Sequence, residues 1–488
     1  MPQNTAPADR EDVIVIGAGP SGLAASLALC RGGVRPLILE RDDGVGGLMR
    51  SLRWRDFIVD LGRKELYTRF PEVDTLWSQA LGEEYGPYPH RVGSLYQGRI
   101  VELSSRYRGM LRGIPPSWLL AGGWAMLRGW LGARAGSPSS YEAYWHGRVG
   151  SVFARVLAQG YWEKFRGRRW SEMAAPEPEA ASGPSASGGM VRQALSLARR
   201  GGVQTQSAWR HPMRGTGQLF ETFHRQIETE GGRVRFHAEV VAIRPRPGEG
   251  FEIEFAEGGK SHLRTARKVI SSLPIERLVE LLGWPVDGRS DSREFQRSVI
   301  LVYLFLDEPP RFPHAWLEVN DPDMPVGRVT NYAAFGGGMV PAGHTALCVE
   351  FFCQSDDAIM ARGEDEVAEL AIEQLASCSL IDRARLIGTE VRRLPRTNAA
   401  ASWREQQTER RQSLLHGLTR YPDLYHVNRP GSDWASLAGL LAAQAILTGD
   451  RKVFDVRGDP TIRHTDAPIR PDVAAAARPV GAIAPSAG

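Results

Sequence analysis

The pattern of apolar and polar positions near the N-terminus predicts a strand, a tight turn and a helix. Residues 13–16 form a short β-branched apolar run, and residues 23–31 carry apolar side chains at helical spacing. A glycine-rich stretch, 17–22, lies between them. A second apolar run at 36–39 predicts the neighbouring strand. This order is the opening of a parallel α/β unit.

Later patterns predict further strands and helices. Phe251, Ile253 and Phe255 alternate with polar residues, which predicts a strand with one buried face. The continuous apolar run at 299–306 and the alternation at 347–352 are typical of an antiparallel sheet. A helix is expected to begin at Pro71, where acidic residues follow in the first turn. The predicted class is therefore α/β, and α+β overall.

Each residue of the glycine-rich turn has a physical reason to be there. Gly17 permits the turn, Gly19 leaves room for a phosphate against the backbone, and Gly22 lets the helix pack closely on the strand. Pro20 and Ser21 open the helix, whose free N–H groups carry about half a positive charge. A pyrophosphate is the ligand that such a helix start favours.

The residues after the second strand narrow the choice of nucleotide to FAD. Glu40 ends that strand, where its carboxylate can accept both hydroxyl protons of an adenosine ribose. Gly46 and Gly47 place a second backbone turn against the diphosphate, and Arg50 neutralises part of its charge. Arg41 and Leu48 complete this group of candidate cofactor contacts.

The spacing of these residues resembles a known group of flavoproteins. Glu40, five residues, Gly46-Gly47, two residues and Arg50-Ser51 match the superfamily of amine oxidases, protoporphyrinogen oxidase, phytoene desaturases and UDP-galactopyranose mutase. The likeness covers about residues 10 to 450. It implies further cofactor contacts at Gly62, Arg63, Val240, Ser272, Gly431, Asp433 and Ala435.

The resemblance also implies a domain organisation. We expect a discontinuous, Rossmann-like FAD-binding domain of the glutathione-reductase type, with an inserted substrate domain of helices and an antiparallel sheet. The FAD-binding domain takes residues 10–75, 205–290 and 395–455, and the substrate domain takes 76–204 and 291–394. The low-complexity stretch 174–189 is expected to be a mobile loop, and the tail 466–488 to be disordered.

Two motifs of the superfamily occur here in altered form. Residues 161–167 resemble its Tyr-x-Glu-Lys-x-Trp-Gly signature, with Arg166 in place of Trp. A simple core stripe of Tyr161 and Phe165 is the alternative interpretation. Residues 428–434 and the helix that carries Gly439 resemble the turn that holds the flavin edge in relatives, although it is shorter here. No Cys lies close to this turn, so the expected FAD is non-covalent.

The segment after Gly62 holds two of the three candidate catalytic residues, Arg63 and Lys64. In relatives it passes the flavin ring with a His-Arg pair, which Lys64 and Glu65 replace here. Three consecutive charges cannot all be buried unpaired. We therefore expect Arg63 and Glu65 to share one face, opposite Lys64. Arg328, in a polar strand, is the third candidate; an ordinary solvated strand face is the alternative.

Composition excludes several classes of protein. A chain of 488 residues favours two domains, and a net charge of +4 is too diffuse for nucleic-acid binding. The four cysteines show neither CxxC spacing nor a metal-ligand cluster, which predicts reduced thiols, a cytoplasmic location and no metal. Only five of the 60 basic residues are Lys, a bias that suggests a GC-rich bacterial genome.

Membrane and assembly signals are sparse. The polar N-terminus is no signal peptide, and no apolar run is long enough for a transmembrane segment. Residues 118–131 are expected to form a helix over a substrate cavity. Trp118, Trp124 and Trp130 keep a peripheral membrane contact as the alternative. The sequence also leaves a homodimer open.

The predicted function is that of an FAD-dependent oxidase, dehydrogenase or desaturase. It would take a hydride from a small organic molecule, such as a secondary metabolite, to flavin N5. One alternative is a mutase or isomerase that uses reduced flavin without net redox. Another is a flavin-binding protein without catalysis. The fold itself does not choose among them.

Overall fold

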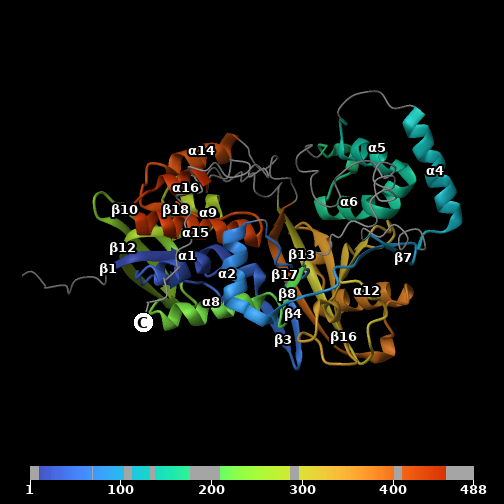
Figure 1. Ribbon diagram of the computed structural model, residues 1–488, viewed down its shortest axis with the longest axis horizontal. Coiled ribbons are helices and arrows are strands. Elements are labelled where there is room, and N and C mark those ends of the chain that lie inside the picture. Colours follow the sequence, from blue (N-terminus) through green and yellow to red (C-terminus); the bar gives the residue numbers. More distant parts are fainter. Residues whose placement is uncertain are drawn as a thin grey trace, which may run out of the picture.

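The computed structural model describes residues 10–68, 70–103, 113–131, 138–175, 209–285, 296–399 and 409–457. These residues form a nucleotide-binding region, a second sheet beside it and a group of helices at the far end (Figure 1). The expected loop at 174–189, except for its first two residues, and the tail at 466–488 lie outside the described residues.

The nucleotide-binding region is built on a parallel sheet in the order β18-β12-β1-β2-β9. β10 and β11 extend β12 on one side as an antiparallel meander. The central strands β1 and β2 are short and apolar on both faces, as strands covered by helices on each side require. The strands are β1 (Arg10–Ile16), β2 (Leu37–Leu39), β9 (Arg233–Arg235), β10 (Glu239–Arg246), β11 (Gly250–Glu257), β12 (Lys260–Ser271) and β18 (Leu424–His426).

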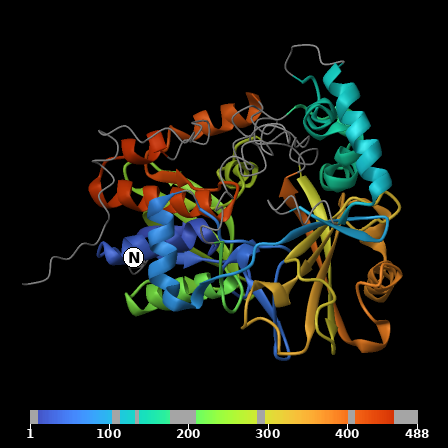
Figure 2. The same cartoon turned by 45° about the vertical axis from the view of Figure 1, so that its right-hand side comes forward.

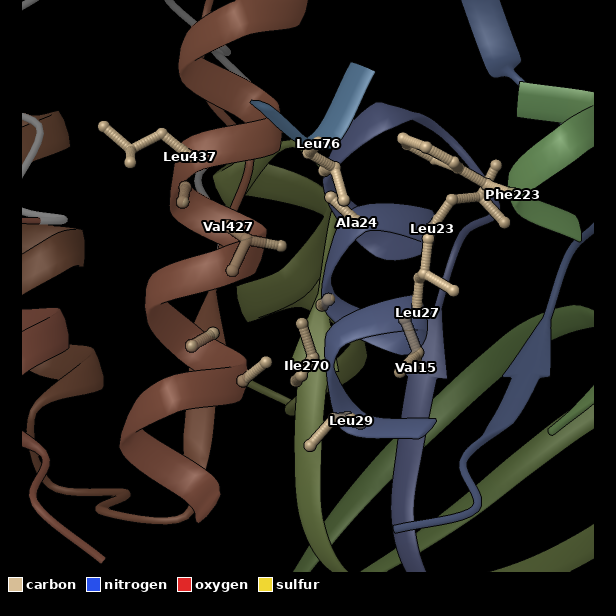
Figure 3. Close-up of a cluster of buried hydrophobic side chains, with 14 of the residues drawn as sticks. Val15, Leu23, Ala24, Leu27, Leu29, Leu76, Phe223, Ile270, Val427 and Leu437 are labelled. Carbon is tan, nitrogen blue, oxygen red and sulfur yellow. The ribbon is translucent and has the colours of Figure 1, made fainter. Parts of the chain in front are cut away.

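Helices cover both faces of this sheet. On one face Leu23 and Leu27 of α1 and Phe223 of α8 lie near Val15 of β1, and Leu437 of α15 belongs to the same buried cluster farther from Val15 (Figure 3). On the other face, Ile14 and its neighbours pack against the meander, α9 and α14. The helices are α1 (Pro20–Arg31), α2 (Pro71–Leu81), α8 (Gly217–Thr229), α9 (Ile275–Leu281), α14 (Glu409–Leu418), α15 (Ser432–Thr448) and α16 (Lys452–Arg457).

The second sheet has the order β17-β13-β16-β15-β14-β6-β7. It is antiparallel as expected except for one parallel pair, β6 with β14, because β6 enters from an earlier part of the chain. Helix α12 (Glu364–Ser377) covers one face, and the hairpin of β3 (Ser51–Trp54) and β4 (Phe57–Asp60) packs on the other. The strands are β6 (Val92–Tyr96), β7 (Arg99–Glu102), β13 (Gln296–Leu306), β14 (Trp316–Val319), β15 (Arg328–Asn331), β16 (Thr345–Cys353) and β17 (Leu386–Ala399).

Two expected domain boundaries fall inside elements. The boundary after residue 75 lies within α2, whose Leu76 and Trp77 pack in the nucleotide-binding core. The boundary before residue 395 lies within β17. Both elements continue because their buried faces extend beyond the point where the sequence changes character.

The third region consists of α4 (Pro116–Leu131), α5 (Tyr141–Ala154) and α6 (Gly160–Arg166), which stand at the end of the second sheet (Figure 2). Phe153 and Trp170 belong to its core. The remaining elements are β5 (Tyr85–Pro87), which pairs with β8 (Arg210–Pro212), and the short α11 (Ala358–Ala361). In the described part of the chain, every helix is too short or too polar to cross a membrane.

Candidate active site at the junction of the two sheets

The first glycine turn has the geometry expected of a phosphate site. Gly17 has φ +93°, and its N–H donates to the Leu39 carbonyl at 2.9 Å. A Cβ on Gly17 would lie 2.2 Å from Ser272 Oγ, and one on Gly22 would lie 2.0 Å from the Gly17 carbonyl oxygen. Both positions therefore require glycine. At Gly19, by contrast, no atom of the described residues lies within 4 Å of a Cβ position.

The second glycine turn faces the first. Gly46 and Gly47 have φ +95° and +53°, and the Gly46 N–H donates to the Ala18 carbonyl at 2.8 Å. A Cβ on Gly47 would lie 3.6 Å from Gly19 Cα. The two turns thus form a cradle at the start of α1 that side chains would fill. We call it the glycine cradle, and it fits a diphosphate.

Glu40 is buried and ties the ends of two strands together. Its Oε2 accepts from the Ala18 N–H at 2.6 Å, and its Oε1 accepts from the Asp42 N–H at 2.9 Å. Each carboxylate oxygen has a second lone pair for a ribose hydroxyl. Arg50 pairs with the exposed Asp43 at 2.8 Å. A bound diphosphate would therefore share the positive charge of Arg50 with Asp43. Arg41 is exposed and lies 3.6 Å from Asp42.

The remaining candidate contacts lie mainly at the carboxyl ends of β12 and β18. Ser272 Oγ donates to the Ile16 carbonyl at 2.9 Å, and Asn428 Nδ2 donates to the Ser272 carbonyl at 2.9 Å. Gly431, with φ +82°, precedes α15, and the Ala435 N–H donates to its carbonyl at 3.0 Å. Asp433 lies in the first turn of that helix. Parallel sheets bind nucleotides at this edge.

Two residues have a packing role in the structure. The Val240 side chain is buried at the irregular pairing of β10 with β11. Gly439, which the resemblance associates with the flavin turn, lets α15 approach α1. A Cβ there would lie 2.2 Å from the Ser21 carbonyl oxygen.

A cavity of about 80 Å³ lies next to the glycine cradle. Its wall includes all three candidate catalytic residues. Leu48, which directly follows Gly47, links it to the cradle. The lining residues are Leu48, Leu61, Arg63, Lys64, Val299, Leu301, Arg328, Glu350, Leu394 and Thr397.

A buried ion pair forms one wall of the cavity. Arg328 donates to both carboxylate oxygens of Glu350, at 2.9 and 2.7 Å, and to Tyr161 Oη at 3.2 Å. The Arg63 N–H donates to Glu350 Oε1 at 3.0 Å. Burial raises the pKa of Glu350, but Arg328, the Arg63 N–H and Lys64 outweigh it and hold that pKa below its usual value. The solvated-face interpretation of β15 is wrong, because all four of its residues are buried.

The three charged residues after Gly62 divide as expected. Arg63 pairs with Glu65 and stacks on Trp316, with its guanidinium carbon 4.1 Å from the ring centre. Tyr88 Oη donates to Glu65 at 2.6 Å. Burial raises the pKa of Glu65, but Arg63, His90 and Tyr88 outweigh it and hold that pKa below its usual value. The expectation that Arg63 and Glu65 share a face is confirmed.

Lys64 is the remaining cation. It lines the cavity, and among the described residues its ammonium makes neither a hydrogen bond nor an ion pair. Burial lowers the pKa of Lys64, and the nearby Glu350 opposes the effect. A cation in this environment is available to an anionic or electron-rich ligand.

The candidate site residues expected from the sequence did not include Glu350, which lines this cavity, or the polar residues Glu318, Asp60 and His211. Glu350 interrupts an otherwise apolar strand, and a buried charge without a sequence neighbour of opposite sign requires a distant partner. That signal was present in the sequence. Glu318 pairs in register with Arg328, and burial raises the pKa of its carboxyl. Asp60 accepts from Ser51 Oγ at 2.5 Å and from the Thr216 N–H at 3.0 Å, and it faces the buried His211.

The altered signature at 161–167 has a structural role. Lys164 Nζ donates to the carbonyls of Val319, Asp321 and Val326, at 3.0, 2.7 and 3.1 Å. These bonds fix α6 to the second sheet. Tyr161 and Phe165 stack as the core-stripe alternative predicted, with ring centres 5.9 Å apart. Tyr161 also reaches Arg328, so the stripe contributes to the cavity wall indirectly.

The helix expected at 118–131 forms as α4, but it does not contribute to the lining of the cavity. The residues that line the cavity come from other elements, and α4 packs against α5. The expectation that this helix covers the cavity is not met by this arrangement.

Comparison with known proteins supports the fold. Residues 15–80 match the family model for an NAD(P)-binding Rossmann-like domain. An L-amino-acid oxidase of Sistrurus catenatus edwardsii is 37% identical over 65 residues, which is 13% of each chain. An inactive all-trans-retinol 13,14-reductase of Danio rerio is 44% identical over 54 residues, 11% of this chain and 9% of that protein. The match thus spans about an eighth of these relatives or less.

Two solved structures resemble nearly the whole chain. Reduced UDP-galactopyranose mutase has a TM-score of 0.72 at 17% identity, covering 92% of this chain and 98% of its own. A proposed protoporphyrinogen oxidase from Exiguobacterium sp. 255-15 has a TM-score of 0.68 at 15% identity, covering 91% and 100%. The chain therefore shares the fold of these two proteins over nearly its whole length.

Proposed function

We propose that this protein is an FAD-dependent oxidoreductase that acts on a small organic substrate. The observation that carries the proposal is the position of Leu48. This residue directly follows the second glycine of the cradle and lines the cavity that contains Lys64. A cofactor held at the cradle would therefore reach the cavity where a substrate can lie.

The proposed cofactor contacts follow from the described residues. The cradle at Gly19 and Gly47 takes the diphosphate, Glu40 takes the ribose, and the start of α15 takes the far end of the cofactor. When bound, FAD supplies a centre that accepts a hydride from a substrate C–H bond. In the proposal the FAD is non-covalent. The proposed FAD-binding domain takes residues 10–75, 205–290 and 395–455. Its first border moves to the end of α2 at Leu81, and its last part begins after the end of β17 at Ala399.

The residues around the cavity would position the substrate and exclude water from it. Leu61, Leu301 and Leu394 provide apolar walls that keep water from the reacting atoms. The pair of Arg328 and Glu350 is neutral as a unit and rigid, so it shapes the cavity. Lys64 places one positive charge where negative charge develops during electron transfer.

The first experiment tests the cofactor. The purified protein should carry one FAD per chain, and denaturation should release it into the filtrate as a yellow chromophore. Glu40→Ala should lose most of the bound FAD, because it removes the ribose acceptor and two backbone hydrogen bonds. Asp42→Ala is the matched control, since Asp42 lies two residues later and is exposed. Equal losses in the two variants would show that the ribose assignment is misplaced.

The second experiment separates redox from mutase chemistry. Under anaerobic conditions the true substrate should bleach the flavin of the oxidised protein. Activity that appears only after reduction with dithionite, without consumption of electrons, would instead support the reduced-flavin mutase. A protein that binds FAD but turns over no candidate substrate in either state would point to a flavin-binding protein without catalysis.

A further inference from the structure

Helix α4 presents an apolar face to solvent. Leu120, Trp124 and Leu127 are 77%, 57% and 44% exposed. Their spacing of four and three residues places them on one side of the helix. Soluble proteins rarely leave such large side chains exposed together without a partner.

The opposite side of α4 is already occupied. Trp118, Leu119 and Met126 pack on the core of the helical region. A Cβ on Gly122 would lie 2.3 Å from the Phe153 ring, so the helix sits closely on α5. The exposed residues therefore do not belong to the side of α4 that contacts the core, because a separate inner side packs against α5.

The sequence around α4 carries only positive charge. From Leu103 to Tyr141 there is no Asp or Glu, and five Arg occur in this stretch. One of them, Arg128, is exposed on α4, with its guanidinium carbon 5.2 Å from the centre of the Trp124 ring. An apolar helix face bordered by arginine is typical of helices that lie in the interface of an anionic membrane.

We propose that α4 docks the protein on an anionic phospholipid surface, with Leu120, Trp124 and Leu127 inserted among the lipids. The helix stands at the outer end of the helical region, away from the nucleotide-binding sheet, where a flat surface can reach it (Figure 2). A second copy of the chain is a poorer occupant. A twofold interface would place this face against itself and bring like charges together.

The test is flotation of the full-length protein with lipid vesicles. The wild type should float with vesicles that contain phosphatidylglycerol and much less with phosphatidylcholine alone. Binding should fall at about 1 M salt, where charges are screened within about 3 Å. Arg128→Gln should weaken binding to the anionic vesicles about fivefold, as loss of one basic residue near the surface predicts.

The apolar face is tested separately. A variant with Leu120→Ser, Trp124→Ser and Leu127→Ser should bind at least about tenfold more weakly. Leu263→Ser is the matched control, because Leu263 is 52% exposed on β12, far from α4 in the chain. Leu120→Ser alone should still show a measurable loss of vesicle binding. Because Leu120 is 77% exposed, this single change leaves the core intact, and it therefore keeps the test valid if the triple variant fails to fold.

Three results would overturn the proposal. The first is a wild type that does not float with anionic vesicles. The second is a Leu263→Ser loss equal to that of the triple variant. The third is a wild-type dimer in solution that the triple variant dissociates, which would make α4 an interface between copies of the chain.

Discussion

At the scale of single residues, Lys64 is the group whose environment is hardest to explain by folding alone. Its neighbours Arg63 and Glu65 neutralise each other, and Arg328 neutralises Glu350. Lys64 lines the cavity without an ion pair among the described residues, and burial lowers its pKa. Removing a group that is costly to bury should not weaken the fold, so its presence is better explained by function.

The first prediction concerns Lys64→Met. FAD occupancy should stay at the wild-type level, the melting temperature should be equal or higher, and the rate of flavin reduction should fall by about tenfold or more. The flavin potential should also shift, since a nearby positive charge stabilises the reduced, anionic form. Lys268→Met is the control, because Lys268 pairs with Asp423 at 2.7 Å in the nucleotide-binding region. Wild-type reduction kinetics and an unchanged potential in the fully loaded variant would remove Lys64 from the mechanism.

At the scale of elements, the contact between α1 and α15 organises the cofactor edge. Both helices begin close to proposed cofactor contacts, and Gly439 lets them approach until a Cβ would overlap the Ser21 carbonyl oxygen. Since that neighbour is backbone, it cannot rotate away. The position of the glycine cradle thus depends on a residue more than 400 positions along the chain.

The second prediction compares two glycine-to-alanine changes within helices. Gly439→Ala should lower the free energy of unfolding by about 1–3 kcal/mol, because overpacking forces the two helices apart. It should also weaken FAD binding. Gly123→Ala on α4 should be neutral or stabilising by up to about 1 kcal/mol, since the described residues leave open space there. Denaturant unfolding and FAD titration measure both effects, and equal stability of the two variants would contradict the packing argument.

At the scale of the whole molecule, His426 links folding to pH. It lies on β18, and its Nε2 lies 3.1 Å from the Leu273 carbonyl oxygen. Burial, with Arg429 and Arg411 nearby, lowers the pKa of His426 from 6.5 to about 3. Between these values the unfolded chain binds a proton that the folded protein does not. Stability from this group is therefore present above pH 6.5 and is lost as pH falls toward 3.

The third prediction follows from this loss of stability at low pH. The wild type should lose about 1.4 kcal/mol per pH unit from this one group below pH 6.5, in addition to losses from other groups. His426→Gln removes the titrating ring, so its stability should fall less steeply over the same range. His416→Gln on the exposed side of α14 is the control and should keep the wild-type slope. Parallel curves for wild type and His426→Gln would refute the assignment.

Much of the nucleotide-binding region could be predicted because its signals are local. The strand, turn and helix at 13–31 depend on adjacent residues, and so do the helix after Pro71 and the alternation along β11. Short-range sterics explain Gly22, since a Cβ there would meet the Gly17 carbonyl oxygen five residues earlier. Gly17 has a positive φ that favours glycine locally, but the side chain nearest to its Cβ position, Ser272, comes from far along the chain. The charge argument for residues 63–65 was also local, and the ion pair confirms it.

Only the tertiary structure decided how distant residues meet. The Arg63 N–H meets Glu350 across 287 positions, and Arg328 is buried because Glu350 on the neighbouring strand pairs with it. Gly439 belongs to a motif that the resemblance links to the flavin, and the structure adds that it packs against α1. Lys164 belongs to an altered signature, and the structure adds that it holds three carbonyls. The sequence by itself determined the local geometry of the glycine cradle, because that geometry needs glycine at fixed neighbouring positions. The cavity beside it required the fold, because its charges are balanced by partners that the chain brings back from far away.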